Sequence, residues 1–113
     1  MTDENERLLH FIRQHGKDYA QACADVDYLR EYRKSKKALL EIEAAELAGL
    51  KTGQERESYA YAHPDYISLL EGMRAAIEKK EYLGLMIKGC WTKVDIWRTK
   101  QANNRKEREA YSA

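Results

Sequence analysis

Residues 8–47 read LLHFIRQHGKDYAQACADVDYLREYRKSKKALLEIEAAEL, and their apolar spacing decides the fold. Steps of four and three residues alternate without a break along this stretch. They average 3.5 residues, so the chosen positions lie along one side of a slightly underwound helix and form a seam that needs a partner. This first seam consists of Leu8, Ile12, His15, Tyr19, Ala22, Val26, Leu29, Arg33, Lys36, Leu40, Glu43 and Leu47.

A second seam with the same spacing follows later in the chain. Two long helices that each carry one seam predict an all-α antiparallel hairpin over residues 3–48 and 64–109, forming a single domain over 1–113. We expect the first helix to be continuous through Gly16 because the spacing passes through it without a shift. The second seam consists of Leu69, Met73, Ala76, Lys80, Leu83, Ile87, Cys90, Val94, Trp97, Gln101 and Asn104.

The helix breakers gather in the connecting segment 49–63. Gly49 is a typical helix stop. Thr52 and Glu55 have the spacing of a capping box, which predicts a short helical turn over residues 53–61. Pro64 then suits the first turn of the next helix, where its missing N–H costs nothing.

Folding at the middle of this segment predicts a register in which facing residue numbers add up to about 112 or 113. This register places Cys23 beside Cys90 as two reduced thiols. It also brings Arg33 and Lys36 level with Lys80. At the other end of the hairpin it sets acidic residues against basic ones: Asp3, Glu4 and Glu6 against Arg105, Lys106 and Arg108.

A further layer of apolar residues flanks each seam and exceeds what a two-helix hairpin can cover. We therefore expect a homodimer in which two hairpins form a four-helix bundle. The flanking residues are Phe11, Cys23, Tyr28, Tyr32, Leu39, Ile42, Tyr66, Leu70, Ile77, Leu85 and Trp91.

Composition narrows the classes of function. Twenty Lys and Arg against 19 Asp and Glu give a net charge of +1, so nucleic acid could bind only at a local patch. The two cysteines and three histidines lack the spacing of a metal site or a catalytic nucleophile, and no general acid and base pair is recognisable. We expect no enzymatic activity, no metal and no cofactor.

The beginning of the chain, MTDENERLLH, is acidic and polar, unlike a secretory signal or transit peptide. No apolar run approaches the roughly 20 residues needed to cross a bilayer. These features predict a cytoplasmic protein without membrane contact.

One candidate binding surface is a basic helix face with Tyr28 and Tyr32 interleaved. It could hold single-stranded nucleic acid by charge and stacking, or bind a phosphate-like anion. Alternatively, the cations are solvated, snorkel, or pair with glutamates. The candidate residues are Arg30, Arg33, Lys34, Lys36 and Lys37, with Lys79 and Lys80 on the facing helix. A second basic cluster, from Arg98 to Arg108, is by default explained by the negative end of its helix dipole.

The other candidate is the hairpin tip, which contains Tyr59, Tyr61, His63 and Tyr66. Tyrosines add contact area at a low entropic cost, so the tip could recognise a protein. The same side chains could instead lock the connecting segment onto the helix ends.

Three stretches resemble small helical proteins encoded by tailed phages and prophages: YLREYRKSKKALL (28–40), YAHPDYISLLEGMRAAIE (61–78) and DIWRTKQANNR (95–105). Genes for such proteins often lie among early genes for DNA recombination and single-strand binding. The resemblance therefore implies a non-enzymatic accessory protein of the host-cell cytoplasm that binds a protein of DNA metabolism or host defence. It transfers no catalytic or binding residue. The alternative function is single-stranded nucleic-acid binding through the basic face.

Overall fold

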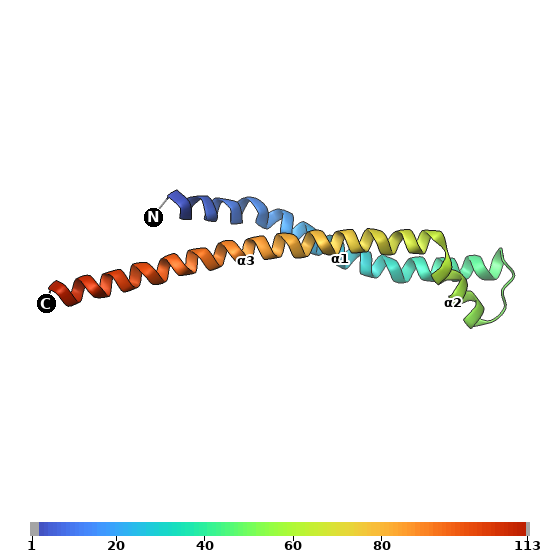
Figure 1. Cartoon of the computed structure of the whole chain (residues 1–113). Coiled ribbons are helices and arrows are strands. Elements are labelled where there is room, and N and C mark those ends of the chain that lie inside the picture. Colours follow the sequence, from blue (N-terminus) through green and yellow to red (C-terminus); the bar gives the residue numbers. More distant parts are fainter. Residues whose placement is uncertain (1–2, 113) are drawn as a thin grey trace. The chain divides into compact units, whose positions relative to one another are not determined.

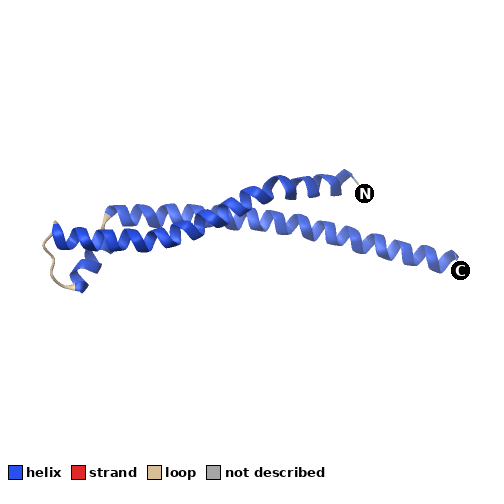
Figure 2. Cartoon of the chain, turned by 180° about the vertical axis from the view of Figure 1, so that it is seen from behind, coloured by secondary structure: helices blue, strands red, loops and turns tan. Residues whose placement is uncertain are grey.

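The computed structural model describes residues 3–112, and the predicted helical hairpin is confirmed. Three helices follow one another: α1 (Asp3–Glu46), α2 (Gly53–Ala62) and α3 (Pro64–Ser112). Helix α1 is continuous through Gly16, as predicted. Figure 2 shows only helices and short loops in the described residues. The long helices end at residues 46 and 112, where the sequence predicted 48 and 109.

The connecting segment forms the predicted helix by local capping. Gly49 ends α1 with a positive φ of 70°, which a residue without Cβ adopts without strain. Thr52 is the N-cap of α2, and its side chain accepts a hydrogen bond of 3.1 Å from the backbone N–H of Glu55. His63 is extended, as the residue before a proline prefers, and Pro64 opens α3.

The described residues belong to two compact units. One comprises Gln21–Lys80, and the other comprises the described residues up to Ala20 together with those from Glu81 onward. Within each unit a segment of α1 runs antiparallel to a segment of α3 (Figure 1). Whether the chain behaves as the predicted single domain stays a prediction.

The predicted seams face inward in both units. All seam residues of α1 from Leu8 to Glu43, and all those of α3 from Leu69 to Gln101, are buried or half-buried. In the unit of residues 21–80, Leu40, Ala60 and Tyr66 form a core cluster with one residue from each helix. This cluster fixes α2 against the last turns of α1.

The predicted register of the hairpin is wrong. The ring of Tyr19 lies 3.1 Å from the position that a Cβ on Gly84 would occupy, and Lys36 Nζ lies 3.7 Å from Asp65 Oδ2. Facing residue numbers therefore add up to about 101–103, not 112 or 113. The reason is that α2 folds alongside the last turns of α1, so that α3 starts level with Lys36 and not beyond the end of α1.

Three expectations fail with that register. Cys90 lines a hollow with Phe11 and Met86, so Phe11 and not Cys23 is the residue of α1 that faces it. Lys36 pairs with Asp65, and Lys80 lies fifteen residues beyond Asp65, which is about 22 Å along α3. Lys80 therefore does not join Arg33 and Lys36. The first turn of α1 is level with residues before 101, which excludes the predicted pairing with Arg105, Lys106 and Arg108.

The contact between Tyr19 and Gly84 leads to a testable difference between two glycines of α3. Alanine stabilises a helix interior by up to about 1 kcal/mol relative to glycine. Gly89→Ala should gain this amount, because a Cβ there meets nothing within 4 Å. Gly84→Ala should gain clearly less, because its Cβ would press on Tyr19 at 3.1 Å. Urea unfolding followed by circular dichroism measures both, and equal gains would contradict the contact.

Candidate functional site

The lysines that the basic face has on α1 are paired with carboxylates. Lys34 Nζ lies 3.2 Å from Glu31 Oε1, and Lys36 pairs with Asp65 at 3.7 Å. Lys37 lies between two acids, 3.8 Å from Glu41 and 3.9 Å from Glu57. This part of the face thus resembles a network of ion pairs more than an open cationic surface.

The remaining cations of the predicted face have no carboxylate partner among the described residues and lie in two groups, one on α1 and one on α3. Among residues 3–112, no carboxylate lies within 4 Å of exposed Arg30, half-buried Arg33, Lys79 or Lys80. Arg30 and Arg33 lie on α1 near the paired lysines, whereas Lys79 and Lys80 lie fourteen and fifteen residues along α3 from Asp65, the partner of Lys36. The structure does not bring the two groups together.

Lys37 also contacts the hairpin tip. Its Nζ lies 4.8 Å from the centroid of the Tyr61 ring, within range of a cation–π interaction. The side-chain interaction with Tyr61 raises the pKa of Lys37, and the charges of Glu57 and Glu41 raise it further, while partial burial acts in the opposite direction. Lys37 therefore connects α1 to α2 as a persistent cation.

The carboxylate of Glu43 is the polar centre of the tip. The Tyr59 hydroxyl donates a hydrogen bond to Glu43 Oε2 over 3.1 Å, and His63 Nε2 lies 3.3 Å from the same oxygen. His63 Nδ1 accepts a 3.0 Å hydrogen bond from the backbone N–H of Asp65. This pattern assigns the proton of the neutral imidazole to Nε2, facing Glu43. The hydrogen bond to Glu43 raises the pKa of Tyr59, with burial and the negative charge acting in the same direction.

The four predicted tip residues thus differ in accessibility. Tyr66 is 7% exposed and packs in the core cluster, and its ring meets Tyr61 edge-on at 5.4 Å. Tyr59 and His63 direct their polar groups to α1, and Tyr61 alone of the four is classed as exposed. Through these contacts, Tyr59, His63 and Tyr66 hold the connecting segment to the helix ends.

Sequence reasoning missed Glu43 as the acceptor that organises the tip. It appeared only as a polar seam position available to nearby cations. A usable signal existed: Tyr59 and His63 are four residues apart, so a short helix presents both to a single acceptor.

The raised pKa values predict a loss of stability at alkaline pH. Each group favours its protonated form in the folded chain, so its contribution is complete below the unfolded pKa, near 10, and is lost as the pH rises through the higher folded value. Urea midpoints should stay constant from about pH 7 to 9 and fall above about pH 10. The urea midpoint of the Tyr59→Phe variant should fall less steeply with pH than that of the wild type. Equal slopes would show that Tyr59 does not titrate against Glu43.

In the unit of residues 21–80, α1 exposes a stripe of large apolar side chains. The stripe, called the α1 stripe below, consists of Tyr28, Tyr32, Leu39 and Ile42. These side chains are 67%, 39%, 58% and 52% exposed. At 100° per residue they fall within an arc of about 80°. The rings of Tyr28 and Tyr32 stack with centroids 6.0 Å apart. This stripe confirms that the apolar layer of α1 exceeds what the hairpin covers.

In the described part of the chain, no group of three or more His, Cys, Asp or Glu side chains is placed to hold a metal ion. None of the helices within residues 3–112 combines the length and the apolar character that crossing a membrane requires. No protein-family model, curated protein or solved structure matches this chain.

Proposed function

We propose that this chain is a non-enzymatic interaction protein that forms a homodimer through the α1 stripe and binds a protein partner. The main support for this proposal is the exposure of four large apolar side chains on one face of α1. Contiguous apolar patches on a protein surface mark interaction sites more often than scattered residues do. An aromatic pair at one end and an aliphatic pair at the other give this patch large contact area.

The arrangement of the stripe favours a second copy of the chain as its occupant. Ser35 lies on the same face, midway between Tyr28 and Ile42, and its small side chain lets another helix approach closely. A two-fold contact centred on Ser35 would lay the tyrosines of one protomer on Leu39 and Ile42 of its partner. Such pairing joins two hairpins and provides the four helices of a bundle.

Sedimentation equilibrium tests the self-association. At tens of micromolar protein we expect a mass close to twice the 13.2 kDa of one chain. A mass of one chain at that concentration would contradict the dimer.

The partner belongs to DNA metabolism or host defence in the host-cell cytoplasm, a proposal supported by the resemblance of three stretches to phage-encoded proteins. Affinity capture from phage-infected cells tests it. A recombination or defence protein that binds the purified chain directly supports the proposal. Capture of chaperones alone would contradict it.

A second candidate function is single-stranded nucleic-acid binding beside the same stripe. The observation in its favour is the exposed stack of Tyr28 and Tyr32, in a stretch of α1 that also contains Arg30 and Arg33, for which the described residues offer no carboxylate within 4 Å. Stacking rings and free cations suit a single strand. Replacing Arg33, Lys34, Lys36 and Lys37 with glutamine should abolish a shift of labelled single-stranded DNA at low salt while helicity is retained. Unchanged binding in that variant would dismiss this face.

A further inference from the structure

The last turns of α3 extend past the described start of α1. Facing residue numbers add up to about 101–103, so Asp3 is level with about residue 99. All residues from 103 to 112 are exposed. Figures 1 and 2 both show α3 running beyond the beginning of α1. We call residues 98–112 the C-terminal arm.

The second seam stops being apolar at the point along α3 that is level with the start of α1. Up to Trp97 the seam positions of this unit are apolar, whereas Gln101, Asn104 and Arg108 occupy the following ones. A helix built to be covered by another apolar helix would continue its apolar seam. The arm instead presents hydrogen-bonding and cationic groups, so its occupant is polar.

Four of the five cations of the arm are unpaired among the described residues, in contrast to the lysines that the basic face has on α1. The arm has five Lys and Arg and two Glu, which leaves a net charge of +3. Arg98 lies 3.9 Å from Asp95. Within residues 3–112, none of the other four cations has a carboxylate partner within 4 Å; these are Lys100, Arg105, Lys106 and Arg108.

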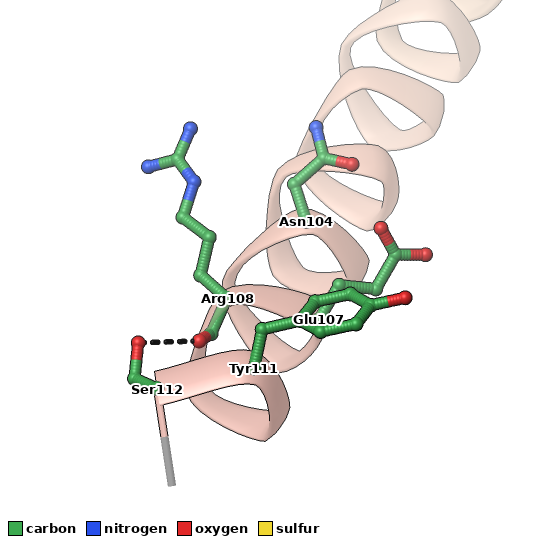
Figure 3. Close-up of a pocket in the computed structure, with 5 residues that line it drawn as sticks. All are labelled: Asn104, Glu107, Arg108, Tyr111 and Ser112. Carbon is green, nitrogen blue, oxygen red and sulfur yellow. Dashed lines mark hydrogen bonds between the residues drawn. The ribbon is translucent and has the colours of Figure 1, made fainter.

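One face of the arm concentrates the groups that recognise nucleic acid. Arg98, Gln101, Arg105 and Arg108 fall within an arc of about 80° at 100° per residue. Figure 3 shows Asn104 and Arg108 extending from the same side of the helix, above a shallow hollow that is formed by this one helix alone. Arginine reads guanine, and asparagine and glutamine read adenine, at base edges of the major groove.

We propose that the C-terminal arm binds duplex DNA in the major groove. A helix about 10–12 Å in diameter fits a groove about 12 Å wide. A continuous basic helix in that groove is an established way of binding DNA. The deep, narrow major groove of duplex RNA excludes it. Tyr111 is the single aromatic residue of the arm, so the arm has no platform for stacking the bases of a single strand.

Fluorescence anisotropy with the full chain and a labelled 20-base-pair DNA duplex tests the proposal. If three arginines contact phosphates, raising the salt from 50 to 200 mM should weaken wild-type binding on the order of 40-fold. The triple variant R98Q/R105Q/R108Q should lose measurable binding at 50 mM salt. Glutamine has nearly the helix propensity of arginine, so the arm stays helical, which circular dichroism checks.

A matched control removes the same charge elsewhere. Arg13, Lys17 and Lys88 are exposed, and no carboxylate of the described residues lies within 4 Å of them, so R13Q/K17Q/K88Q should bind like the wild type. Equal loss in both variants would reduce the effect to net charge and overturn the proposal. Equal affinity for single-stranded DNA, duplex RNA or polyglutamate would overturn the duplex assignment, as would no binding at 50 mM salt.

Discussion

Ala60→Glu should lower the free energy of unfolding by about 3–5 kcal/mol, the usual cost of an uncompensated buried charge. Ala60 has no exposed surface, and it packs between Leu40 of α1 and Tyr66 of α3. A carboxylate there must stay in the core unpaired or force α2 away from α1. Either response removes the cluster that fixes the connecting segment.

Ser58→Glu is the matched control, because Ser58 lies on the same helix with an exposed side chain. Both variants add one negative charge to α2. Ser58→Glu should change the free energy of unfolding by less than about 0.5 kcal/mol. Urea unfolding followed by circular dichroism compares them, and similar small losses would mean that α2 is not docked on α1.

Leu39→Gln combined with Ile42→Gln should convert the dimer to a monomer. In a two-fold contact along the α1 stripe, the double variant removes four aliphatic side chains from the interface. Full burial of such a side chain contributes about 1.5 kcal/mol or more, and these are about half exposed in the single chain, so the four together contribute about 3 kcal/mol and the dissociation constant should rise roughly a hundredfold or more. The fold should be retained, because both side chains are more than half exposed in the single chain.

Leu47→Gln combined with Ile67→Gln provides the comparison. These residues are 79% and 46% exposed and lie outside the stripe. This variant should keep the mass of a dimer in sedimentation equilibrium. If the Leu39→Gln/Ile42→Gln variant stays a dimer, or if the control variant also dissociates, the α1 stripe is not the dimer interface.

The helices and their inward faces could be predicted from sequence because both depend on local information. The spacing of residues such as Val26 and Met73 identified the buried sides, and the capping pair of Thr52 and Glu55 located α2. Gly49 and Pro64 marked where the long helices end and begin. These signals act within a few residues of the chain.

The register could not be predicted because it depends on where α2 packs. A connecting helix beyond the end of α1 and one beside it have the same local sequence signals. Contact of Ala60 with Leu40 selects the second arrangement and shifts α3 along α1. The ion pair of Lys36 and the acceptor role of Glu43 follow from that shift, so the predicted cation cluster with Lys80 does not form. On sequence alone the basic cluster from Arg98 to Arg108 is explained by the helix dipole, because the sequence does not show that it extends past the described start of α1.

The register of the hairpin decides which cations are paired and which are exposed, and crosslinking measures it directly. In a Cys23→Ala, Cys90→Ala background, Tyr19→Cys with Gly84→Cys should give an intrachain crosslink with a short bismaleimide, because these positions are in contact. The wild-type cysteines should give none under the same conditions. A crosslink between Cys23 and Cys90, with none between positions 19 and 84, would contradict the register and everything derived from it.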